Sequence, residues 1–183
     1  MTIEQNALIG NLVHSLQTGD VLARIDSLII DPNELKIVAL ALRGRKTIIV
    51  WRDLREISPR GIVVDDDSAL VDRDSIVRLK AIRQYRFKLI GLRVRDKHHR
   101  RLGVIVNYSI DVATGEIDHI ITHTGLFGCG DELYIGRDQI IEISDRYVIV
   151  DAPTVQVARS AAFGINHRAF DPATDNPFRC RVN

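Results

Sequence analysis

The sequence lacks several features that would each have defined its class. Only two of its 183 residues are cysteines, Cys129 and Cys180, and they lack the paired spacing of a zinc site, so we expect reduced thiols and no disulfide framework. No apolar run reaches the roughly 18 residues of a membrane-spanning helix, and no signal-peptide pattern opens the chain. We therefore predict a cytoplasmic protein.

Patterns typical of enzymes are also missing. The glycine-rich segment 125–130 precedes an expected strand, whereas a phosphate-binding loop must lead into a helix N-terminus. His119 and His123 lie four residues apart on an expected strand, roughly 13 Å, which is too far to share one metal ion. The remaining polar groups, His98-His99 beside Asp96 and Asp65–Asp67, are typical of solvated turns. We predict no enzymatic activity, no cofactor and no metal.

An internal repeat is the most informative pattern that is present. Leu8-Ile9-Gly10 recurs 81 residues later as Leu89-Ile90-Gly91. From Leu22 to Leu42 the match continues at a constant offset of 80 residues, and Glu56-Ile57-Ser58 recurs after an insertion as Glu142-Ile143-Ser144. A repeat of this length is a small domain rather than a solenoid unit. We therefore predict two homologous domains in tandem.

Each copy is predicted to consist of β-strands, because β-branched and alternating residues are separated by short turn signals. The expected strands span 11–16, 21–30, 35–42, 47–51 and 61–64 in copy one, and 92–95, 101–111, 116–124, 132–135 and 147–150 in copy two. The apolar phase slips near Ser27 and again near Asn107, which is typical of a β-bulge. A short antiparallel meander of this kind buries its edges best by curling into a barrel.

The predicted fold class is therefore mostly β, with two tandem small antiparallel barrels at residues 7–70 and 87–152. Residues 71–86 indicate a helical connector, since Asp72 can cap a helix that reaches about residue 84. The first six residues are expected to be only a lead-in. Residues 153–183 have no counterpart in the repeat, and we expect an extended C-terminal tail that rests on the barrels or docks on a partner or second subunit.

The repeated residues also resemble a known family. They are Leu89-Ile90-Gly91, Val94, Leu102-Gly103, Ile105, Ile110-Asp111 and Thr114-Gly115, and their pattern resembles the PRC-barrel family. Members include the cytoplasmic domain of the photosynthetic reaction centre H subunit and the C-terminal domain of the RimM ribosome maturation factor. In copy one, Ala23 and Leu35 replace two glycines of the pattern. The resemblance implies a non-enzymatic β-barrel used for assembly, without either member's specific role.

Charge is unevenly distributed along the chain. The formal net charge is +1, yet residues 72–101 contain eleven lysines or arginines against three aspartates. Arginine's planar fork suits carboxylate or phosphate partners. The predicted partner-binding residues are Arg78, Lys80 and Arg83 on the connector, and Arg93, Arg95, Lys97, Arg100 and Arg101 on the first hairpin of copy two.

Three interpretations of this basic segment stay open. Its residues pair with acidic residues between the barrels, bind an acidic protein, or bind RNA; few aromatic residues accompany them, which weakens the case for single-stranded RNA. We predict a protein-binding adaptor, with homo-oligomer formation through the tail as a further option. The alternatives are an RNA-associated factor in ribosome or RNA maturation and a sensor of a small ligand in a cleft between the barrels.

Overall fold

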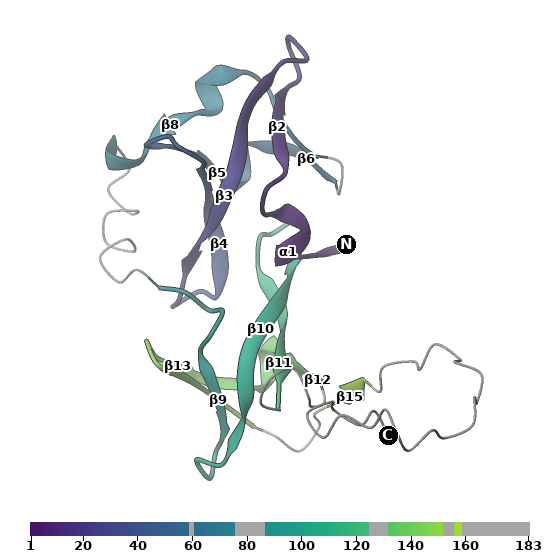
Figure 1. The fold of residues 1–183 in the computed structure, drawn as a ribbon, viewed down its shortest axis with the longest axis vertical. Helices are drawn as coiled ribbons and strands as arrows, with labels where there is room; N and C mark the ends of the chain where they lie inside the picture. The colour runs from purple at the N-terminus through teal and green to yellow at the C-terminus, as the bar shows by residue number, and fades with distance from the viewer. Residues whose placement is uncertain (59–60, 76–86, 125–131, 152–155, 159–183) are drawn as a thin grey trace, which may run out of the picture.

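The computed structural model describes residues 1–58, 61–75, 87–124, 132–151 and 156–158. In this part of the chain nearly every regular element is a β-strand, and the one α-helix, α1 (Gln5–Leu8), is four residues long. Two β-sheets lie one above the other along the long axis of the molecule (Figure 1). The prediction of a mostly β protein with two β units is confirmed.

The two sheets have the same strand order. The first runs β6-β7-β2-β3-β4-β5-β8 and the second runs β13-β14-β9-β10-β11-β12-β15. The strands of the first sheet are β2 (Leu12–Ser15), β3 (Val21–Asp31), β4 (Lys36–Leu42), β5 (Thr47–Val50), β6 (Leu54–Ser58), β7 (Gly61–Val64) and β8 (Val71–Asp72). Those of the second are β9 (Arg93–Asp96), β10 (Arg101–Asp111), β11 (Ile117–His123), β12 (Glu132–Gly136), β13 (Ile140–Ile143), β14 (Tyr147–Val150) and β15 (Gln156–Ala158).

The prediction of a simple antiparallel meander is wrong at one step in each sheet. Strands β6 and β13 were not expected, and each reverses the chain once more, so that β7 pairs parallel with β2 and β14 pairs parallel with β9. Both missed strands are edge strands that carry charged residues, and this hides the alternation by which a strand is recognised. Within the described residues neither sheet closes into a full barrel.

The two predicted phase slips are confirmed as β-bulges. In the pairing of β3 with β4 the register shifts between Ile25 and Ser27, and in that of β10 with β11 it shifts between Ile105 and Asn107. Each pairing has a second shift near the end of the long strand. A bulge bends a strand and increases its twist. Each long strand can therefore begin in one hairpin and end beside the other sheet.

The N-terminal residues are more than a lead-in. Strand β1 (Thr2–Glu4) pairs antiparallel with β10, with Ile3 opposite Ile110. The start of the chain therefore adds a strand to the second sheet, although its sequence is continuous with the first. The repeat did not predict this pairing. It shows which segments of the two halves correspond, but it gives no information on contacts between the halves.

One hydrophobic core runs through both halves. Leu8, Ile25 and Ile37 from the first half and Ile105 and Ile117 from the second are almost completely buried in it. Burying a side chain of this size contributes about 1.5–3 kcal/mol relative to leaving it exposed. The two sheets are thus joined by apolar packing as well as by the backbone.

The joint between the sheets is a contact between two equivalent turns. Ile37 N–H donates to Gly115 O at 2.8 Å, and Ile117 N–H donates to Leu35 O at 3.0 Å. Lys36 and Glu116 form the β-bridge between them. Since these positions match at the offset of 80 residues found in the sequence, the two hydrogen bonds are reciprocal.

Each turn is also held by a side chain from the other half. The indole of Trp51 lies over Gly115, where an added Cβ would come within 2.8 Å of Trp51 Cδ1. Arg137 Nη1 donates to Leu35 O at 3.1 Å, and its Nη2 donates to Glu34 O at 2.6 Å. Trp51 and Arg137 both begin the short 3-10 turns after β5 and β12, η1 (Trp51–Asp53) and η4 (Arg137–Gln139).

Part of the expected connector and most of the tail lie outside the described residues. Residues 71–72 of the expected connector form β8, which pairs with β5, and the 3-10 turn η3 (Arg73–Ser75) follows. Asp72 Oδ1 accepts from the Asp74 N–H at 2.8 Å, as expected of a capping residue. Arg78, Lys80, Arg83 and both cysteines lie outside the described residues. No helix in the described ranges is long and apolar enough to cross a membrane.

Gly115→Ala is expected to destabilise the protein more than Gly19→Ala. Both glycines have a positive φ, +75° and +76°, which a side chain disfavours, but nothing lies within 4 Å of a Cβ at Gly19. We expect a loss of about 1 kcal/mol for Gly19→Ala from backbone strain. The clash with Trp51 should add about 1–3 kcal/mol for Gly115→Ala. Urea unfolding of both variants measures the difference, and equal losses would contradict the Trp51 contact.

Candidate partner-binding surface

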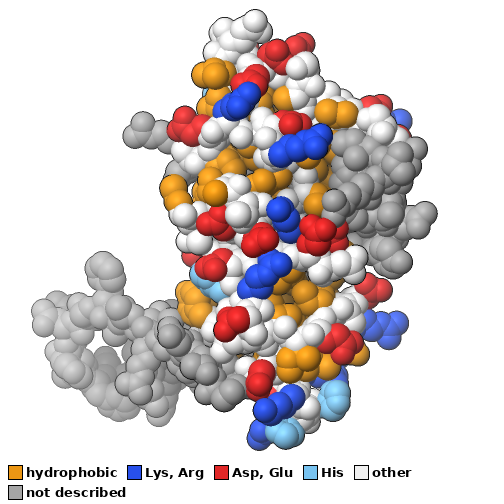
Figure 2. Space-filling model, turned by 180° about the vertical axis from the view of Figure 1, so that it is seen from behind, with side chains coloured by type: hydrophobic (Ala, Val, Ile, Leu, Met, Phe, Trp, Pro, Cys, Tyr) orange, Lys and Arg blue, Asp and Glu red, His pale blue; other side chains and the backbone are white. Residues whose placement is uncertain are grey.

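The β9–β10 hairpin lies at the end of the molecule farthest from the first sheet (Figure 1). Figure 2 shows lysine, arginine and histidine side chains gathered at this end. The described basic residues of the hairpin therefore do not lie between the two sheets. The interpretation that they are neutralised there is wrong for these five residues, since the hairpins of the two halves point away from the joint.

Two of the five basic residues have acidic partners within the second half. Lys97 Nζ lies 3.1 Å from Asp151 Oδ1, and Arg100 Nε lies 2.8 Å from Asp96 Oδ2. Both basic side chains are largely exposed, and exposed ion pairs of this kind contribute little stability. Their charges are nevertheless compensated locally.

Asp96 organises the turn of this hairpin. Its side chain is only 6 % exposed, and its Oδ1 accepts from the backbone N–H groups of His98 and Arg100, both at 2.8 Å. Burial by itself would raise the pKa of the Asp96 carboxyl, but the Arg100 backbone N–H, the Arg100 guanidinium and the His98 N–H together lower the pKa below its ordinary value. Asp96 is therefore a structural anion, and Arg100 is part of its turn.

The other three arginines lie on one face of the second sheet. Val94 points into the core, so its neighbours Arg93 and Arg95 point outward on the opposite face. Arg95 lies directly opposite Arg101 across the β9–β10 pair. Within the described part of the chain no carboxylate forms an ion pair with any of the three.

Strand β14 completes this surface. Its parallel pairing places Tyr147 beside Arg93 and Ile149 beside Arg95. The Arg95 guanidinium carbon lies 5.9 Å from the centre of the Tyr147 ring, within the range of a cation–π contact. We call Arg93, Arg95, Arg101, Tyr147 and Ile149 the arginine face. The sequence did not indicate Tyr147 or Ile149, because their position depends on the unexpected parallel pairing.

The first sheet has no such face. The pair that corresponds to Arg95 and Arg101 is His14 and Val21, and the counterpart of Arg93 is Leu12. Two like charges directly opposite each other on a sheet are destabilising. The second half therefore carries a cost in stability at this pair that the first half avoids at the corresponding pair.

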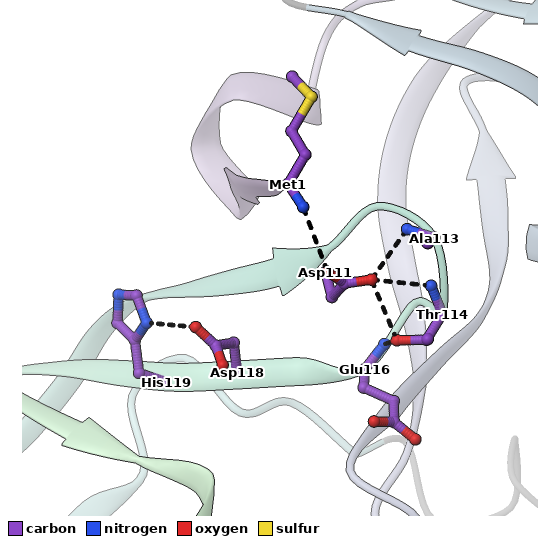
Figure 3. Close-up of polar contacts among 7 residues, drawn as sticks. All are labelled: Met1, Asp111, Ala113, Thr114, Glu116, Asp118 and His119. Carbon is purple, nitrogen blue, oxygen red and sulfur yellow. Dashed lines mark hydrogen bonds and ion pairs between the residues drawn. The ribbon is translucent and has the colours of Figure 1, made fainter.

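A serine, a histidine and an aspartate also meet on the second sheet, but they cannot act as a catalytic triad. His119 Nδ1 lies 2.7 Å from Ser109 Oγ and 3.2 Å from Asp118 Oδ2 (Figure 3 shows the Asp118 contact). A triad needs the serine and the carboxylate on different ring nitrogens, so that a proton taken at one is balanced at the other. Here both contact Nδ1, and Ser109 is only 3 % exposed.

The remaining polar groups of Figure 3 hold the β10–β11 turn. Asp111 Oδ1 accepts from the N–H groups of Ala113 and Thr114 at 2.9 and 3.0 Å, and its Oδ2 lies 3.5 Å from the Met1 amino group. The pKa of the Asp111 carboxyl is lowered, and the hydrogen bond from the Thr114 N–H has the largest effect. Within the described ranges no three His, Cys, Asp or Glu side chains are placed to hold a metal ion.

The second half is thus a small open β module with a charged outer face and a buried core. Residues 83–157 match the family model of the PRC-barrel domain. This range contains β9 to β14, so the family resemblance is confirmed for the second half. The match does not extend to the first half, whose membership stays a prediction. No curated protein matches the chain closely enough to provide a named relative.

Asp96→Asn is expected to change how stability depends on pH. Because the pKa of Asp96 is lowered in the folded protein, its carboxylate stabilises the fold above the unfolded pKa of about 3.9, and that contribution is lost as pH falls through the folded pKa. The variant should therefore be less stable than the wild type at neutral pH and approach it in acid. Thermal unfolding between pH 7 and pH 2 measures this.

Asp145→Asn is the matched control, because Asp145 is exposed and also lies in a turn between two strands. It should keep the stability of the wild type at neutral pH, where Asp96→Asn is expected to lose stability. A constant gap between Asp96→Asn and the wild type down to the lowest pH would contradict the assignment.

Proposed function

We propose that this chain is a non-enzymatic adaptor that binds an acidic protein partner through the arginine face. The observation that carries the proposal is the contrast within one hairpin. Lys97 and Arg100 have carboxylate partners, whereas Arg93, Arg95 and Arg101 share an outer face with no described carboxylate paired to them. Unpaired guanidinium groups side by side favour a partner that supplies the missing negative charge.

We further propose that the adaptor is built from two PRC-barrel-like domains in tandem. The identical strand order of the two sheets supports this, as do the bulges at corresponding positions of β3 and β10. The family match covers the second domain only. In this arrangement the first domain packs against the second at the turn-to-turn joint. The arginine face lies away from that joint.

The other two functions considered for the sequence receive less support. Direct hydrogen bonds and the Trp51 and Arg137 contacts occupy the joint at which a ligand cleft was considered. For RNA, the arginine face offers one aromatic ring, and Arg95 lies over that ring. Stacking platforms, on which single-stranded RNA binding depends, are therefore few.

Arg93→Glu/Arg101→Glu is expected to abolish binding of an acidic polypeptide. Both side chains are exposed and lack a described ion-pair partner, so their reversal changes the surface without breaking a structural contact. Fluorescence anisotropy with labelled poly-L-glutamate and with a labelled RNA hairpin, each across a salt series, measures the effect. We expect poly-L-glutamate to bind wild type more tightly than the RNA does.

The matched control is Arg45→Glu/Arg52→Glu, which makes the same change of charge on exposed arginines of the first half. It should retain most of the binding. Tighter binding of the RNA, with a steep salt dependence that only Arg93→Glu/Arg101→Glu removes, would replace the adaptor by the RNA-associated function. No binding of either probe at low salt would refute both.

A further inference from the structure

The geometry points to an extended acidic segment with a carboxylate at every second residue as the partner of the arginine face. This inference rests on the proposed function, because it names the partner of the same surface. It specifies how the carboxylates of the partner are spaced along its chain, in addition to their total charge.

The spacing follows from the strand itself. Arg93 and Arg95 are two residues apart on β9 and point to the same side. Side chains two residues apart on a strand are separated by roughly 6.6 Å. An extended peptide that lies along β9 has the same repeat, so its residues i and i+2 face the sheet at that spacing. Carboxylates at those two positions reach Arg93 and Arg95 together.

One end of the face has twice the positive charge. Arg101 lies directly opposite Arg95, and directly opposed residues on neighbouring strands have Cβ atoms about 5 Å apart. Two long side chains that begin this close together can bring both guanidinium groups to one carboxylate, each donating to one oxygen. The like-charge repulsion of the free protein is then relieved on binding. The next carboxylate of the peptide, two residues along, lies at Arg93.

Tyr147 and Ile149 are the neighbours of Arg93 and Arg95 on strand β14. The Arg95 guanidinium lies over the Tyr147 ring, with its central carbon 5.9 Å from the ring centre. A cation–π contact uses a face of the guanidinium and not its N–H groups, so those groups can still donate to a carboxylate. Ile149, beside Arg95, and Val104, opposite Arg93, are partly buried apolar neighbours on either side of β9. They lower the local exposure to water, which strengthens charge-assisted hydrogen bonds.

Two peptides of the same composition test the spacing. One has the sequence Thr-Thr-Asp-Thr-Asp-Thr-Thr, in which the two aspartates alternate and face the sheet together, and the other has Thr-Thr-Asp-Asp-Thr-Thr-Thr, in which they are adjacent and point to opposite sides. Each is labelled with fluorescein and titrated with the full chain at low salt, and anisotropy gives the dissociation constant. We expect the alternating peptide to bind about tenfold more tightly, the change expected for one additional arginine–carboxylate contact.

Conservative variants assign the preference to individual residues. Arg95→Lys keeps the charge but loses the fork, so it should remove most of the difference between the two peptides. Tyr147→Leu keeps an apolar side chain but loses the ring, and it should weaken the alternating peptide several-fold. Arg45→Lys, on an exposed turn of the first half, is the control and should change nothing. Unchanged thermal unfolding of each variant verifies that it is folded.

The outcomes separate this inference from the proposed function. Equal binding of the two peptides that is lost in Arg93→Glu/Arg101→Glu would overturn the spacing and leave the adaptor intact. Binding of neither peptide, while poly-L-glutamate binds through the same residues, would also overturn it. If an unlabelled oligouridine displaced the alternating peptide at lower concentration than the unlabelled peptide itself does, the surface would be one for RNA.

Discussion

Two backbone hydrogen bonds, from Ile37 N–H to Gly115 O and from Ile117 N–H to Leu35 O, join the two sheets at a pair of equivalent turns. The strands that lead into these turns, β3 and β10, both contain bulges, which bend a strand. The corresponding turns of the two halves are contacted by different types of side chain. An indole covers Gly115, while a guanidinium binds the carbonyl groups of Glu34 and Leu35. A symmetric backbone thus carries asymmetric side-chain contacts.

The arrangement determines which surfaces remain free. Because the β3–β4 and β10–β11 turns meet at the centre, the hairpins at the other ends of β3 and β10 are directed to opposite ends of the molecule (Figure 1). At one end the corresponding pair is His14 and Val21, and at the other it is Arg95 and Arg101. The same strand order in the two sheets gives two corresponding hairpins, and both lie away from the joint. The charges of the β9–β10 hairpin therefore lie outside the core.

The sequence predicted the elements that alternate cleanly and missed those that depend on contacts between distant segments. The long strands and their bulges follow from the apolar phase of residues such as Ile25 and Ile105. Strand β1 could not be foreseen, since its partner lies more than 100 residues away. Leu35 was expected to begin a strand, but it has a φ of +48° in the turn, where its carbonyl accepts from Ile117 and Arg137. The repeat aligns Leu35 with the turn glycine Gly115, and both have a positive φ, but the pattern does not show which groups bind the Leu35 carbonyl.

At the candidate site, too, the sequence identified the charged residues but not the contacts that each of them makes. Arg100 and Arg101 are adjacent and indistinguishable by sequence, yet Arg100 is bound to Asp96 in its turn, whereas Arg101 faces Arg95 across the sheet. A protein selected for stability alone would separate such a like-charge pair, as the first half does with His14 and Val21. In the proposed function, a carboxylate of the partner relieves this like-charge repulsion. In the proposed function, recognition therefore depends on the arginines without a described ion-pair partner and not on the total positive charge of the segment.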